Sequence, residues 1–155
     1  MTVYGDAEFE IGDTARRLRG LATALTDLRP FWPIGRGIVV DWMRRHYDSK
    51  GAFGGEPWAA LSPTYARWKA TVRPGKPLLV FDGGLKRATL APDPSYSPQE
   101  MRLTIRARHA IYHQAGTRRM PARPIVPRRI PGAALRELER AVDDYVEREI
   151  QRWGF

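Results

Sequence analysis

Two histidines four residues apart, His109 and His113, are the first residues of this chain whose type and spacing could bind a metal ion. On a helix, this spacing would bring both imidazole rings to one face. Here they follow a segment with the alternation of a β-strand and stand close to glycine and proline, so that helical geometry is not expected. The third histidine, His46, falls on the apolar stripe of a predicted helix, where it is expected to pack or to form a hydrogen bond. Neither a metal site nor a cofactor is predicted.

The groups that usually carry covalent catalysis are missing from the sequence. There is no cysteine, no Gly-x-Ser-x-Gly elbow, no phosphate-binding glycine loop and no dinucleotide fingerprint. The acid pairs Asp143-Asp144 and Glu137/Glu139 lie among arginines on a predicted amphipathic helix, which indicates a solvated face. The sequence therefore favours a protein that is not an enzyme.

A regular array of arginines is the feature with the clearest functional content. Residues 101–108 alternate between apolar and polar side chains without a fault, which predicts a strand whose exposed face carries Arg102, Arg106 and Arg108. Alternate positions on a strand lie about 6.6 Å apart. That spacing suits phosphates along a nucleic-acid backbone or carboxylates on a neighbouring subunit, although a merely solvated sheet face would look the same.

The charge of the chain is large and unevenly distributed. It has 26 basic and 17 acidic residues, a net charge of +9, and eight arginines without any acid between residues 102 and 129. Such a balance favours acidic partners: nucleic acid, an anionic membrane face or an acidic protein ring. No apolar run approaches the roughly 20 residues that span a bilayer, and the first residues do not resemble a signal peptide. An intracellular site of assembly or action is therefore expected.

Residues 114–131 are predicted to form a projecting arm. They contain prolines 121, 124, 127 and 131, which restrict the backbone before any partner is bound. The residues expected to contact neighbouring subunits or partners are Arg118, Arg119, Arg123, Arg128 and Arg129. At the end of the sequence, Trp153 and Phe155 should cover either the body of the protein or a neighbour.

The pattern along the chain predicts one α+β domain covering residues 1–155. A short strand is expected at residues 3–11, followed by a helix with Asp13 as N-cap and a second helix with Pro33 in its first turn. The second helix would bury Ile34, Ile38, Trp42 and His46, and a short helix would start at Ser62-Pro63.

The second half of the chain predicts a hairpin and a last helix. Residues 86–91 would pair with residues 101–108 across a Pro/Ser loop, and a long amphipathic helix would begin at Pro131. We therefore expect a small antiparallel sheet with its hairpin packed against two N-terminal helices and the C-terminal helix. Trp58 and Trp68 are expected to cover the core of this domain rather than to anchor a partner.

Several segments, in order, resemble the virion morphogenesis or tail-completion (neck) family of long-tailed bacteriophages. The family pattern is an aromatic helix end, a glycine-rich loop to Pro-Trp, a Leu-Ser/Thr-Pro helix start, an apolar run into Gly-Leu, a hairpin, Tyr-Ala-x-x-His-Gln-x-Gly and Ala-Arg-Pro. In this chain the corresponding segments are Tyr47, Glu56-Pro57-Trp58, Leu61-Ser62-Pro63-Thr64, residues 78–85, residues 109–116 and Pro121-Ala122-Arg123-Pro124. The match covers about residues 8–150 and departs from the pattern at His109 and Ile125, where aromatic residues are usual.

The resemblance implies a structural protein of the virion, assembled in the host cytoplasm, that joins the head connector to the tail at the head–tail junction. It implies a homo-oligomeric ring around the DNA path, with six subunits as the expected number. The neighbours would be head-completion, tail-terminator or tail-tube proteins, with possible contact to packaged DNA and none to a membrane. The alternative from the residues alone is a stand-alone, sequence-nonspecific protein that binds double-stranded DNA through the arginine array.

Overall fold

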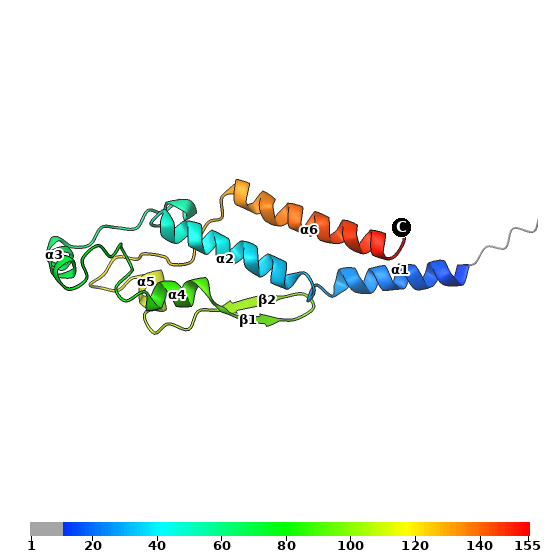
Figure 1. Cartoon of the computed structure of the whole chain (residues 1–155), viewed down its shortest axis with the longest axis horizontal. Helices are drawn as coiled ribbons and strands as arrows, with labels where there is room; N and C mark the ends of the chain where they lie inside the picture. The colour runs from blue at the N-terminus through cyan, green and yellow to red at the C-terminus, as the bar shows by residue number, and fades with distance from the viewer. Residues whose placement is uncertain (1–10) are drawn as a thin grey trace, which may run out of the picture.

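A computed structural model describes residues 11–155 of the chain, which form an elongated molecule (Figure 1). Within this range there are six α-helices and one two-stranded antiparallel sheet, so the predicted α+β class is confirmed. Three long helices form the body: α1 (Ile11–Thr26), α2 (Trp32–Asp48) and α6 (Gly132–Arg152). Helices α1 and α2 follow each other nearly end to end, and α6 runs back along α2 until it reaches α1 (Figure 1).

The shorter elements lie along one side and at one end of this body. The hairpin consists of β1 (Asp93–Tyr96) and β2 (Met101–Thr104), and α2 lies between it and α6 (Figure 1). The C-terminal helix packs on α1 and α2, and Met101 of β2 lines a hollow together with Leu138 and Val142 of α6. At the far end stand η1 (Ala52–Gly54), α3 (Pro63–Val72), α4 (Gly84–Leu90) and α5 (Ala110–Ala115).

The first helix begins earlier than its predicted N-cap. Asp13 lies inside the first turn of α1, where its carboxylate pairs with Arg16 at 3.1 Å. Its negative charge also interacts favourably with the positive end of the helix dipole. The helix ends at Thr26, ahead of Pro30. The strand expected at residues 3–11 falls outside the described part of the chain, except for Ile11, which begins α1.

The second helix agrees with the prediction at its start and along most of its buried face. Pro33 occupies the first turn of α2, and Trp42, Met43, His46 and Tyr47 are buried. Ile34, by contrast, is 42% exposed, so this position of the predicted stripe is not part of the core. The predicted cap of the next helix is also confirmed, since the hydroxyl of Ser62 accepts a hydrogen bond from the Tyr65 amide.

The hairpin is real, but its first strand was predicted in the wrong place. Residues 86–91 belong largely to α4. The N-cap of this helix, Gly83, is in a left-handed conformation, and the Asp82 carboxylate accepts from the Gly84 amide at 2.7 Å. The partner of β2 is instead residues 93–96, with Pro94 opposite Leu103. The second strand ends at Thr104, yet side chains continue to alternate between half-buried and exposed as far as Arg108.

Candidate partner-binding surface

The predicted arm does not project as a whole, and this is the largest correction that the structure makes. Residues 122–127, here called the strap, contact α2, α5 and the segment 58–60. Arg123 is 4% exposed and Ile125 is 2% exposed, and Ile125 forms the core together with Tyr47 and Trp58. Arg123 donates from its guanidinium to the carbonyls of Ala59 and Ala60, at 2.7 and 2.8 Å. It is therefore not a free contact residue.

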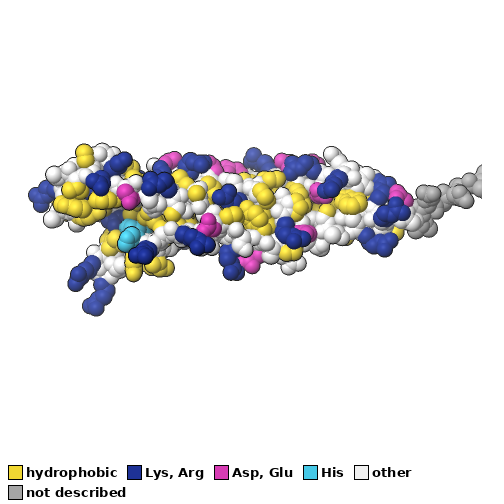
Figure 2. All heavy atoms as spheres, turned by 60° about the horizontal axis from the view of Figure 1, so that its bottom comes forward, with side chains coloured by type: hydrophobic (Ala, Val, Ile, Leu, Met, Phe, Trp, Pro, Cys, Tyr) yellow, Lys and Arg dark blue, Asp and Glu magenta, His cyan; other side chains and the backbone are white. Residues whose placement is uncertain are grey.

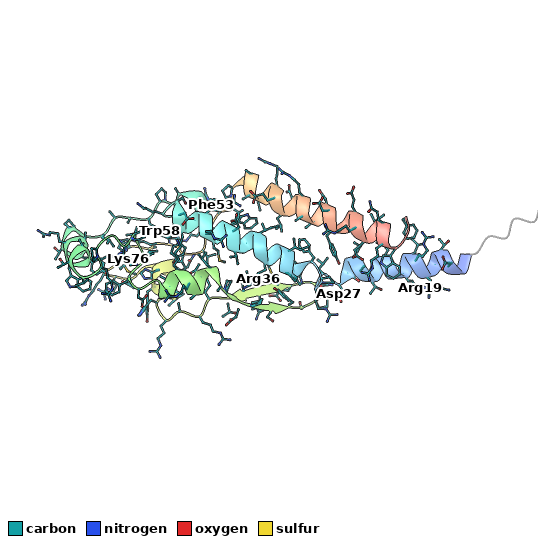
Figure 3. All side chains as sticks on the ribbon, viewed as in Figure 1. Arg19, Asp27, Arg36, Phe53, Trp58 and Lys76 are labelled. Carbon is teal, nitrogen blue, oxygen red and sulfur yellow. The ribbon has the colours of Figure 1, made fainter. Side chains whose placement is uncertain are left out.

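A set of hydrogen bonds holds the strap in place. Trp58, which follows η1 in the chain and lies beside the C-terminal end of α2 (Figure 3), donates its indole N–H to the Pro124 carbonyl at 2.7 Å, and His46 Nε2 lies 2.8 Å from the same oxygen. The side-chain oxygen of Gln114 accepts from the amides of both Ile125 and Val126, at 3.0 Å each. The side-chain nitrogen of Gln114 donates to the Val126 carbonyl at 3.2 Å.

The strap contacts bring together three of the segments that carry the resemblance. Trp58, His113-Gln114-Ala115-Gly116 and Ala122-Arg123-Pro124 lie against one another, with the Arg123 amide donating to the His113 carbonyl at 2.7 Å. Gly116 is required at its position because a Cβ there would lie 2.8 Å from the Ala122 nitrogen, and its φ is +77°. These motif residues therefore position the strap.

Burial makes the strap contacts sensitive to pH through His46. Its Nε2 faces a carbonyl and must carry the proton, while its Nδ1 accepts from the Gly54 amide at 3.3 Å, so the buried ring is neutral. Burial lowers the pKa of His46, against smaller raising effects of the Pro124 carbonyl and of Glu56. Burial also lowers the pKa of His113, helped by the charges of Arg123 and His109.

Stability should therefore fall as the solution becomes acidic. A base whose pKa is lower in the folded chain binds fewer protons there, so acid favours unfolding. The loss should begin as the pH drops below about 6.5, the ordinary value for histidine, and should grow by at most about 1.4 kcal/mol per pH unit for each proton. Urea unfolding between pH 7 and pH 5 measures this slope. A His46→Gln variant should be less stable yet show a shallower slope; an unchanged slope would contradict the assignment.

The part of the predicted arm that does project is a tight turn. Thr117 and Met120 form an isolated antiparallel bridge, with Arg118 and Arg119 exposed at its tip. Figure 2 shows basic side chains on such a projection beside histidine. Beyond the strap, Arg128 and Arg129 are exposed too, and Arg128 pairs with Glu56 at 3.3 Å. Helix α5 has His109 as its N-cap and His113 one turn later. The two histidines therefore do have a helical spacing, which we did not expect from the sequence.

The predicted array of Arg102, Arg106 and Arg108 lies only partly in a strand. Of its members, Arg102 alone lies in β2, because the strand ends at Thr104. Arg102 pairs with Glu100 at 3.1 Å, and Arg106 pairs with Asp93 across the hairpin. Arg102, Arg106 and Arg108 are all exposed. These neighbouring carboxylates offset two of the three arginine charges, which weakens the attraction of the arginine array for phosphates.

The C-terminal aromatic residues pack against the body of the protein. The ring of Trp153 lies over Gly20 of α1, and Arg17 donates to the Trp153 carbonyl at 2.6 Å. Phe155 remains 49% exposed, with the Arg17 guanidinium 4.9 Å from its ring centroid. Trp153 therefore covers the body of the protein, one of the two predicted roles, while Phe155 keeps an accessible face.

A large cavity among the described residues is lined by several basic side chains. It lies between α3, α4 and the 117–123 turn, has a volume of about 1140 Å³, and is hereafter called the basic cavity. Its apolar lining residues include Leu79, Val80, Phe81 and Leu85. The lysine and arginine residues around it are Lys69, Arg106, Arg108, Arg119 and Arg123. His109 and His113 also line it, and Asp82 is its one acid.

A second hollow, of about 460 Å³, lies where α1, α2 and α6 meet and has only apolar and glycine residues in its lining. Leu25 and Val142 at this apolar groove are 37% and 38% exposed. Leu28, Phe31, Leu138 and Tyr145 complete much of its wall. A groove of this composition suits an apolar side chain from another protein better than a polar ligand.

No group of three or more histidine, aspartate or glutamate side chains in residues 11–155 is arranged to hold a metal ion. Over the same residues, no helix combines the length and the apolar character needed to cross a bilayer. Comparison of the chain with protein-family models, with curated proteins and with solved structures found no match.

Proposed function

We propose that this chain is a structural, non-enzymatic protein of the bacteriophage head–tail junction, acting as one subunit of a ring that joins the head connector to the tail. The ordered motifs of the neck family support the proposal, and their meeting around the strap gives those motifs a common structural purpose. The observation that carries it is the shape of the subunit, which leaves more surface uncovered than a self-contained monomer does.

The accessible surface of the chain is 11031 Å². A compact monomer of 17.7 kDa would expose roughly 7,900 Å². Even if residues 1–10 contributed their full unfolded area, roughly 1,700 Å², the remainder would exceed that value. The excess is what a subunit that completes its packing in an assembly would show.

The uncovered surface includes large apolar side chains along all three long helices. Leu18 is 51% exposed, Ile34 42% and Leu135 43%, and the apolar groove lies among these helices. An open groove lined by apolar side chains is typical of a protein–protein contact site. A ring gives every subunit the same contact, so one such face can be covered around the whole circle.

Deleting the coding gene from the phage genome tests this function directly. We expect filled heads and separate tails to accumulate, with few joined particles, when lysates are viewed by electron microscopy. The wild-type gene supplied from a plasmid should restore joined particles, which would also contain the chain by mass spectrometry. Normal joined particles in the absence of the gene would overturn the proposal.

A stand-alone DNA-binding protein remains the alternative, and a salt titration separates the two. That function requires the free chain to bind duplex DNA tightly and to lose affinity steeply as salt rises. The pairs of Arg102 with Glu100 and of Arg106 with Asp93 speak against it, because these carboxylates compete with phosphate.

A further inference from the structure

The basic cavity contains buried positive charges that the rest of the described chain does not neutralise. Lys69 is 6% exposed and Arg123 is 4% exposed, and both line the cavity. Lys69 donates to the Pro77 carbonyl at 2.6 Å, and Arg123 donates to the carbonyls of Ala59 and Ala60. Neither forms an ion pair with a carboxylate of residues 11–155. Burial lowers the pKa of each, as expected where a charge has lost water without gaining an opposite charge.

The rim of the cavity adds to this positive potential. Arg108 and Arg119 are exposed, and neither has a carboxylate partner among the described residues. The Nδ1 atom of His113 is buried and has no hydrogen-bond partner within residues 11–155. Because the lining combines apolar and cationic side chains, the matching ligand is a peptide that carries both apolar side chains and carboxylates.

The sequence of this chain contains one segment with that composition. Residues 1–10 include three acids, Asp6, Glu8 and Glu10, and no lysine or arginine. Tyr4 and Phe9 supply aromatic side chains that could pack on the apolar lining residues of the cavity. We propose that the basic cavity binds residues 1–10 of a neighbouring copy of this chain.

The geometry requires a second copy. Residue 11 begins α1, at the opposite end of the molecule from α3 and the basic cavity (Figure 1). Helices α1 and α2, with 16 and 17 residues, lie nearly end to end and span roughly 50 Å at 1.5 Å per residue. Ten fully extended residues reach at most about 36 Å. The segment therefore cannot fold back to the cavity of its own chain.

A contact between opposite ends of two copies is heterologous, so it repeats from subunit to subunit and closes into a ring or continues as a filament. The inference rests on the proposed function in that it names a contact of the proposed ring. Its test uses the purified chain alone, so the proposed contact and the proposed function can fail separately. Virions that contain the chain, together with a peptide that does not bind, would overturn the contact alone; a peptide that binds, together with virions that lack the chain, would overturn the function alone.

The test is a binding titration of the full-length chain with a fluorescein-labelled peptide of residues 1–10, followed by anisotropy. We expect saturable binding that weakens as salt rises. The peptide with Asp6→Asn, Glu8→Gln and Glu10→Gln should bind at least about tenfold more weakly, as expected when three charge pairs at the cavity are lost. Equal binding by a scrambled peptide of the same composition would overturn the proposal.

Matched variants place the contact on the chain. Arg108→Glu with Arg119→Glu changes two exposed residues of the cavity rim, whereas Arg102→Glu with Arg129→Glu makes the same change of net charge at exposed positions outside it. We expect at least about a tenfold loss of affinity for the first pair and less than about threefold for the second, with unchanged circular dichroism. Equal losses would overturn the proposal. So would a duplex oligonucleotide that binds more tightly than the peptide and loses its affinity in the rim variant.

Discussion

Replacing Trp58 with alanine is expected to lower the free energy of unfolding by about 3–5 kcal/mol, the usual cost of emptying a large aromatic site in a core. Trp58 is 7% exposed and packs edge-to-face on Tyr47 and on His46, with ring centroids 5.1 and 5.6 Å apart. Its indole N–H also donates to the Pro124 carbonyl. The substitution removes the packing of α2 on the strap and one of the two donors to that carbonyl. Urea unfolding followed by circular dichroism measures the change.

Two further variants separate packing from hydrogen bonding. Trp58→Phe keeps most of the ring but removes the donor, and it should cost only about 1 kcal/mol for the hydrogen bond, because His46 still contacts the Pro124 carbonyl. Trp68→Ala is the matched control for loss of a tryptophan. Trp68 is 49% exposed and stacks on Phe81 at the surface, so its loss should cost much less than that of Trp58. Equal effects of Trp58→Ala and Trp68→Ala would show that the strap is not part of the cooperative core.

The contrast between these two tryptophans illustrates how far the sequence could be interpreted. Both were predicted to cover the core, and the prediction is wrong for Trp68, which lies on α3 at one end of the elongated molecule (Figure 1) and is 49% exposed. Helices α2 and α6 were predictable because their apolar residues recur with the helical period over many turns. Short elements such as α4 and α5 offered fewer than two full turns, too little for a period to appear.

The candidate site was harder to predict than the fold. A run of prolines and arginines looks like an exposed arm, and for Arg118 and Arg119 that interpretation agrees with their exposure. For Arg123 it is wrong, because carbonyls of Ala59 and Ala60, more than sixty residues away in sequence, accept from its guanidinium. The basic cavity likewise joins Lys69 to Arg119, residues that no local pattern connects. One sequence signal was available: prolines at 124 and 127 flank two amides that need an acceptor, and Gln114 lies within the neighbouring motif.

Replacing Gln114 with leucine is expected to lower the free energy of unfolding by about 3 kcal/mol while leaving the volume of the side chain nearly unchanged. The substitution removes the acceptor of the Ile125 and Val126 amides and the donor to the Val126 carbonyl. Each buried backbone group left without a partner costs about 1–3 kcal/mol. Because the Gln114 contacts are only part-buried, water should replace some of them. The expected total for the three backbone groups is therefore at the low end, about 1 kcal/mol for each group. Urea unfolding gives the total loss.

Amide hydrogen exchange tests the same variant locally. The amides of Ile125 and Val126 should be protected in the wild-type chain and should exchange faster in Gln114→Leu, since the strap would open without global unfolding. Gln114→Glu keeps the acceptor but loses the donor, so it should retain much of that protection and lose about 1–2 kcal/mol. Gln151→Leu, on the exposed face of α6, is the control and should stay within about 0.5 kcal/mol of wild type. If Gln114→Leu behaved like that control, water would satisfy the strap amides, and Gln114 would not be what holds residues 122–127 in the core.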